Sequence, residues 1–117
     1  MSSQTVLVTG GAGFIGSHTA QRFANAGYAV RVLDDLSTGS RENLSPAWDF
    51  RCADVTDPEA SVDAARDCQV VVHLAAFTSV ADSFERHREC TRVNVHGTFN
   101  VLEACSQNRV ERLVFAS

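Results

Sequence analysis

Short apolar segments alternate with longer amphipathic stretches along the whole chain. Five of the apolar segments are predicted to be strands, at residues 5–9, 29–34, 48–53, 69–74 and 112–116. Apolar positions at helical spacing predict helices over 13–25, from 56 onward, near 80–85 and over 89–106. Such alternation favours a parallel sheet with right-handed crossovers. The expected fold class is therefore α/β, a doubly wound Rossmann sheet of about five strands, truncated after the fifth.

The same periodicity predicts which helical side chains face the core. They are Ile15, Thr19 and Phe23 in the first long helix, Val62 and Ala65 in the second, and Val93, Phe99, Leu102 and Cys105 in the last. Thr56 and Glu59 have the spacing of a capping box and predict the start of the helix between them.

Closely spaced glycines follow the first strand. Gly10, Gly13 and Gly16 fit G-x-x-G-x-x-G, and counting from Gly11 the loop also fits G-x-G-x-x-G. A strand that ends in glycines and continues as a helix presents backbone N–H groups to an anion. The pattern predicts a dinucleotide-phosphate site, and its alternative is a tight turn that binds nothing.

An acidic residue ends the second predicted strand. Asp34 stands eighteen residues after Gly16, close to the distance at which dinucleotide-binding folds place a ribose-binding carboxylate. A carboxylate there would accept both hydroxyls of the adenosine ribose and repel a 2′-phosphate. The cofactor expected from these residues is NAD rather than NADP.

Composition narrows the function classes. The 117 residues suit one domain, 1–117, and the net charge of −4 with scattered arginines argues against nucleic acid as a partner. No apolar run approaches the roughly 20 residues of a membrane span, and Gln4 leads straight into a strand without a signal peptide. A cytoplasmic location is expected, with no membrane partner.

The four cysteines and four histidines form no metal-ligand cluster in the sequence. We expect no metal site and no disulfide, with the cysteines as small buried hydrophobic residues. His73, at the end of a core strand, is interpreted as a structural histidine.

Six motifs occur in a recognisable order: VLVTGGAGFIGSH, LDDLSTG, DV, HLAA, NVHGT and VFAS. Together they resemble the extended short-chain dehydrogenase/reductase family, and within it the NAD-dependent nucleotide-sugar epimerases and dehydratases. The resemblance implies a NAD-binding Rossmann domain and hydride transfer at the sugar C4.

The resemblance also implies roles for individual residues. At the adenosine end, Phe14 and Ile15 would offer N–H groups to the pyrophosphate, Asp34 would hold the ribose, and the pocket would be lined by Asp35, Leu36, Ser37, Thr38 and Gly39. Asp54 would accept from the adenine amino group, with the Val55 backbone beside it.

At the nicotinamide end, Leu74, Ala75 and Ala76 would pack on the cofactor. Thr78 stands where some family members have a lysine that reaches the phosphates, and Asn94 would help to order the active site.

The family's catalytic Tyr-x-x-x-Lys pair is absent from these residues. Tyr28 is the single tyrosine and lysine does not occur, so no catalytic residue is assigned. The expected protein is the N-terminal fragment of a longer enzyme and is inactive by itself. Its full-length form is expected to take a nucleotide-sugar as substrate. Whether it forms a homodimer is left undecided. The alternatives are a stand-alone NAD-binding or redox-sensing module and a non-functional remnant.

Overall fold

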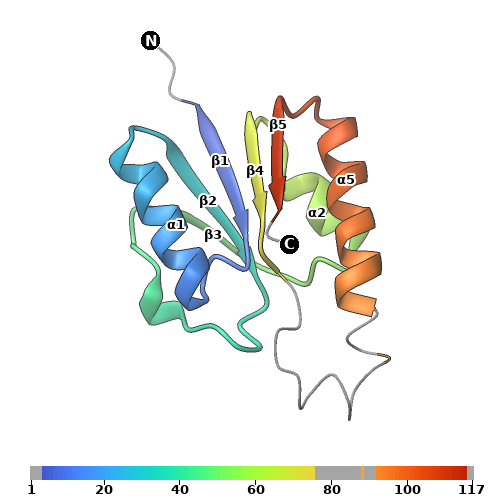
Figure 1. Cartoon of the computed structure of the whole chain (residues 1–117), viewed down its shortest axis with the longest axis horizontal. Coiled ribbons are helices and arrows are strands. Elements are labelled where there is room, and N and C mark those ends of the chain that lie inside the picture. Colours follow the sequence, from blue (N-terminus) through green and yellow to red (C-terminus); the bar gives the residue numbers. More distant parts are fainter. Residues whose placement is uncertain (1–3, 76–87, 89–91, 116–117) are drawn as a thin grey trace.

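Five parallel strands form one sheet in the order β3-β2-β1-β4-β5 (Figure 1). The strands are β1 (Thr5–Thr9), β2 (Ala29–Asp34), β3 (Asp49–Cys52), β4 (Val70–His73) and β5 (Arg112–Phe115). The computed structural model describes residues 4–75, 88 and 92–115. The chain has the predicted Rossmann-like α/β fold.

Helices cover both faces of the sheet (Figure 1). Helix α1 (Phe14–Asn25) lies on one face, and α2 (Pro58–Ala64) and α5 (Thr98–Gln107) lie on the other. A 3₁₀ turn, Arg41–Asn43, precedes β3, and a π-helix, Arg92–Gly97, leads into α5.

The strands alternate their side chains between two apolar cores. Val6 and Val8 of β1 pack in the core under α1, together with Ala20. Leu7, between them in the sequence, packs in the core under α2 and α5, together with Val101. Because both faces are covered, the central strands are apolar throughout.

Small residues face the sheet over the first half of α1. Gly16, Ser17 and Ala20 are the buried positions, and Phe23 packs against the same core as predicted. Ile15 is 69% exposed, so its predicted core position is wrong. The reason is a close approach of the helix to the loop before it. A Cβ on Gly16 would overlap the carbonyl oxygen of Gly10.

The predicted start of α2 is displaced by one residue. Asp57 is the N-cap, and its Oδ1 accepts hydrogen bonds from the N–H groups of Glu59 at 3.1 Å and Ala60 at 3.3 Å. Pro58 occupies the first turn, where its missing N–H costs nothing. Asp57 is thus the cap in place of Thr56.

The last helix is not one uninterrupted α-helix. Its described part starts as the π-helix Arg92–Gly97 and continues as α5. At about 3.6 residues per turn, positions 99 and 102 lie on the side of the helix opposite Val93. Val101, Ala104 and Cys105 are buried, whereas Phe99 is 61% and Leu102 46% exposed. The predicted inward positions of Phe99 and Leu102 are therefore wrong.

Burial of the cysteines follows the position of each strand and helix. Cys68 and Cys105 are buried as expected, but Cys52 is exposed because β3 is an edge strand. All three are free thiols. Cys90 and the helix predicted near 80–85 lie outside the described residues.

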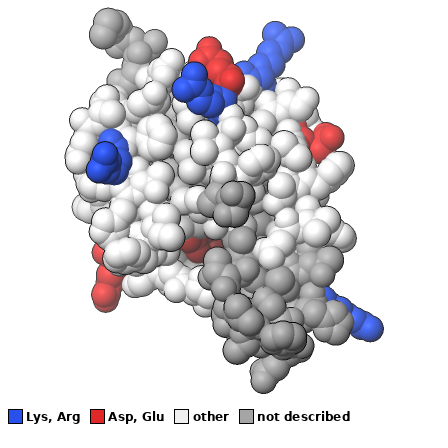
Figure 2. All heavy atoms as spheres, in the orientation of Figure 1, with Lys and Arg blue, Asp and Glu red and all other residues white. Residues whose placement is uncertain are grey.

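Two observations concern nucleic acid and membranes, the partners that the composition argued against. On the face in Figure 2 the arginines lie apart from one another, with acidic side chains among them. Across the described ranges, no helix is long and apolar enough to cross a bilayer.

Candidate functional site

The loop after β1 approaches the end of β4 very closely. Gly10 has a φ of +72°, a conformation that favours glycine. A Cβ at this position would lie 2.9 Å from the backbone nitrogen of Ala75 and 2.9 Å from the carbonyl carbon of Leu74. Protein packing alone therefore accounts for glycine at position 10.

Gly13 differs, because the protein leaves room in front of it. Among the described residues, the atom nearest to an added Cβ would be the Gly10 carbonyl oxygen at 3.5 Å. Gly13 is also the N-cap of α1, and no described side chain caps the helix. The first N–H groups of a helix have no partner within it, and the helix dipole makes this end positive. Such a place fits a phosphate.

Phe14 and Ile15 form the first turn of α1 at this opening. The two residues are 76% and 69% exposed, and α1 starts at the end of the sheet where the strands finish (Figure 1). Ligands in doubly wound sheets bind outside the carboxyl ends of the strands. The structure thus brings the predicted phosphate-binding groups to the expected edge.

Asp34 ties the glycine loop to the loop that follows β2. Its Oδ2 accepts from the N–H of Ala12 at 2.9 Å, and its Oδ1 accepts from the N–H of Leu36 at 2.7 Å. A carboxylate has about four acceptor positions, so capacity for ribose hydroxyls remains. The carboxylate is held beside the glycine loop, as a ribose-binding residue must be.

The loop of residues 35–40 folds back against Ala12. Asp35 Oδ1 accepts from the N–H of Ser37 at 2.9 Å, and Leu36 adopts a φ of +63°, which is uncommon for a residue other than glycine. A Cβ on Gly39 would lie 2.6 Å from the carbonyl carbon of Ala12. The segment that holds the predicted adenosine-pocket residues, Thr38 among them, therefore lies against the glycine loop.

Sequence reasoning missed Asn43 as a support of this segment. Its Nδ2 donates to the Ala12 carbonyl oxygen at 2.8 Å, and the N–H of Ser40 donates to the same oxygen at 3.0 Å. The only sequence signal was its place in a polar stretch after a Gly-Ser turn.

Asp54 and Val55 follow β3 at the same edge of the sheet. The N–H of Thr56 donates to Asp54 Oδ1 at 2.9 Å, and Val55 is buried. The Val55 carbonyl oxygen accepts from Ser61 Oγ at 3.2 Å and from Asn100 Nδ2 at 3.0 Å. Ser61 and Asn100 were not predicted to belong to the site.

A buried chain of hydrogen bonds holds the end of β4. Thr9 Oγ1 lies 2.6 Å from His73 Nδ1, and His73 Nε2 lies 3.0 Å from Thr98 Oγ1. The N–H groups of Leu74 and Ala75 donate to Thr9 Oγ1 at 3.0 and 3.2 Å. Burial lowers the pKa of His73 to about 4, so the ring is neutral near pH 7. Both ring nitrogens have partners, which agrees with a structural histidine.

The remaining predicted site residues are Asn94, Ala76 and Thr78. Asn94 lies in the π-helix and is half-buried. Ala76 and Thr78 lie outside the described residues.

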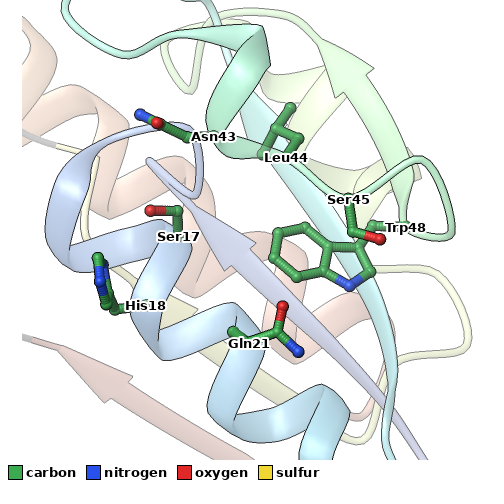
Figure 3. A pocket seen from close by; sticks show the side chains of 7 residues that line it. All are labelled: Ser17, His18, Gln21, Asn43, Leu44, Ser45 and Trp48. Atoms are coloured by element: carbon green, nitrogen blue, oxygen red, sulfur yellow. The ribbon is translucent and has the colours of Figure 1, made fainter.

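A shallow pocket lies between α1 and the segment before β3 (Figure 3). It measures about 340 Å³ and is lined by Ser17, His18, Gln21, Asn43, Leu44, Ser45 and Trp48. None of the predicted cofactor residues lines it, and its lining holds neither a carboxylate nor an arginine. We assign the site to the strand ends instead. Within the described ranges, no group of three or more His, Cys, Asp or Glu residues could hold a metal ion.

Comparison with known proteins decides the family. The model of the NAD dependent epimerase/dehydratase family matches residues 6–117. The chain belongs to this family. The UDP-glucose 4-epimerase of Bacillus subtilis is 39% identical over 121 aligned residues, which cover 96% of this chain and 36% of that enzyme. The chain thus spans little more than a third of this relative's length.

Solved structures give the same result. The UDP-glucose 4-epimerase of Thermus thermophilus, in complex with NAD, superposes with a TM-score of 0.92 at 46% identity, covering 97% of this chain and 37% of that one. The Thermotoga maritima UDP-glucose 4-epimerase with UDP-glucose gives 0.94 at 36% identity, covering 97% and 38%. The family is NAD-dependent, and these neighbours are nucleotide-sugar epimerases.

Proposed function

We propose that this chain binds NAD along the carboxyl edge of its sheet and forms the dinucleotide-binding part of a nucleotide-sugar epimerase. The observation that carries the proposal is the space in front of Gly13, at a helix start that no described side chain caps, beside the carboxylate of Asp34. A phosphate and a ribose would occupy these two places at once.

The residues present fit such a cofactor. The N–H groups of Phe14 and Ile15 would hold the pyrophosphate, and Asp34 would accept from the adenosine ribose hydroxyls. Asp54 would accept from the adenine amino group. Leu74 and Ala75 are half-buried at the end of β4, where a flat nicotinamide ring would lie over their backbone.

The proposed substrate of the whole protein is a UDP-sugar, because the similar enzymes are UDP-glucose 4-epimerases. Bound NAD would supply a hydride acceptor for the sugar C4. These 117 residues include no lysine, and Tyr28 packs edge-on against Phe23 with ring centroids 4.9 Å apart, within the core under α1. We therefore propose that the chain binds dinucleotide without epimerase turnover of its own, as a stand-alone binding module also would.

Cofactor preference tests the proposal. We expect the purified chain to bind NAD at least about tenfold more tightly than NADP, since Asp34 would repel the 2′-phosphate. Asp34→Ala should weaken NAD binding by about tenfold, the loss of a charged hydrogen bond, and reduce the preference over NADP. Calorimetric titration of both dinucleotides measures both effects.

Asp63→Ala is the matched control. Asp63 is an exposed aspartate on α2 that pairs with Arg51 at 2.9 Å, away from the strand ends. This variant should keep the affinity and preference of the unmodified chain. If the Asp34→Ala variant preferred NAD over NADP as strongly as the unmodified chain does, the assignment of Asp34 would be refuted.

A further inference from the structure

Helix α5 and the π-helix before it reach across to the segment after β3. Asn100 Nδ2 donates to the Val55 carbonyl oxygen at 3.0 Å, although 45 positions separate the two residues. Gly97 lies against the same residue, because an added Cβ there would come within 2.6 Å of Val55 Cγ2. The end of the π-helix and the start of α5 therefore both lie against Val55.

The peptide group that joins Val55 to Thr56 is hydrogen-bonded at both ends. Its oxygen accepts from Asn100 Nδ2 and from Ser61 Oγ, and its N–H donates to Asp54 Oδ1 at 2.9 Å. Rotation of this peptide would withdraw the N–H and change the direction of the Asp54 carboxylate. The orientation of Asp54 is thus linked through one rigid peptide to Asn100.

We propose that Asn100 is a positioning residue for adenine recognition. It does not contact the cofactor; it holds the Val55–Thr56 peptide so that Asp54 faces the exocyclic amino group of adenine. This inference rests on the proposed function, since it concerns the adenine end of the same site.

A second asparagine at the other end of α5 makes a similar hydrogen bond that does not involve Asp54 or Val55. Asn108, on the C-terminal side of α5, donates through Nδ2 to the Val62 carbonyl oxygen at 2.9 Å and so ties this helix to α2. Its other side-chain hydrogen bond goes to the Ala104 carbonyl oxygen at 2.9 Å, away from Asp54 and Val55. It is a matched control, because both asparagines donate to a distant, partly buried carbonyl group.

The experiment compares NAD with nicotinamide hypoxanthine dinucleotide, which carries an oxygen in place of the adenine amino group. We expect the unmodified chain to bind NAD about tenfold more tightly, because hypoxanthine offers Asp54 no amino group. Asn100→Ala should reduce this ratio to about twofold, chiefly by weakening NAD binding. Asn108→Ala should keep the ratio, whatever its effect on melting temperature.

The outcomes separate the two proposals. If the unmodified chain does not bind NAD, the proposed function fails. If it binds NAD but Asn100→Ala keeps the ratio, or weakens both dinucleotides equally, the positioning role is overturned and the proposed function stands. Ser61→Ala removes the second donor to the same oxygen and should reduce the ratio too, so it replaces Asn100→Ala if that variant does not fold.

Discussion

The hydroxyl group of Thr9 donates its proton to Nδ1 of His73, 2.6 Å away in the core. This direction follows from the other partners of the hydroxyl, because the N–H groups of Leu74 and Ala75 both donate to Thr9 Oγ1. His73 is therefore the tautomer with its proton on Nε2, which donates to Thr98 Oγ1 at 3.0 Å. One hydroxyl thus joins the ends of β1 and β4 beneath the proposed nicotinamide position.

Thr9→Val should destabilise the chain by about 1–3 kcal/mol. Valine has a similar shape, so the loss comes from the buried partners of the hydroxyl, the Ala75 N–H and His73 Nδ1. Thr19→Val, at an α1 threonine whose hydroxyl donates to the Ile15 carbonyl oxygen at 2.8 Å, should stay within about 0.5 kcal/mol. Urea unfolding measures both, and equal losses would contradict the network.

The pKa of His73 predicts a loss of stability in mild acid. Burial lowers this pKa from 6.5 to about 4, so below pH 6.5 the unfolded chain takes up a proton that the folded chain does not. Stability contributed by His73 is present above pH 6.5, decreases as the pH falls, and levels off below about pH 4. The full effect is about 3 kcal/mol.

His73→Gln isolates this effect. The free energy of unfolding of this variant should depend less on pH between 6.5 and 4 than that of the unmodified chain. The same slope in both chains would show that His73 is not the group responsible.

Two glycines of the loop should respond differently to valine. Gly13→Val should lower the stability by less than about 1 kcal/mol, because the nearest described atom to an added Cβ is 3.5 Å away, yet it should abolish NAD binding. Gly16→Val should prevent stable folding, because even a Cβ would overlap the Gly10 carbonyl oxygen. Thermal unfolding and calorimetry distinguish the two, and normal NAD affinity in Gly13→Val would contradict the phosphate site.

Asp57→Ala should cost about 1 kcal/mol, because two N–H groups at the start of α2 lose their acceptor. Asp57→Asn keeps a capping oxygen and should retain most of the stability. The midpoint of urea unfolding tests both, and an unchanged midpoint in Asp57→Ala would contradict the cap.

Strand positions, fold class and the glycine loop could be predicted from the sequence because each leaves a local pattern. Continuous apolar runs such as Val6-Leu7-Val8 are what a sheet covered on both faces requires, and the glycines lie next to one of them. The place of Asp34 beside this loop could be predicted because it ends the second strand, eighteen residues after Gly16.

Helix faces and distant supports could not be predicted in the same way. Ile15 was expected to be buried because it is large and apolar, but Gly16 faces the sheet in its place, where the close approach to Gly10 leaves no room for a side chain. Phe99 and Leu102 were expected to be buried with Val93, but at about 3.6 residues per turn they lie on the opposite side of the helix. Asn43 and Asn100 support the site through hydrogen bonds to Ala12 and Val55, and contacts over 31 and 45 positions leave no local signal.

Titration of NAD into the purified chain by calorimetry tests the central claim most directly. We expect saturable binding to one site per chain, lost in Gly13→Val while the melting temperature stays close to that of the unmodified chain. No heat of binding from a folded, unmodified chain at millimolar NAD would contradict the account.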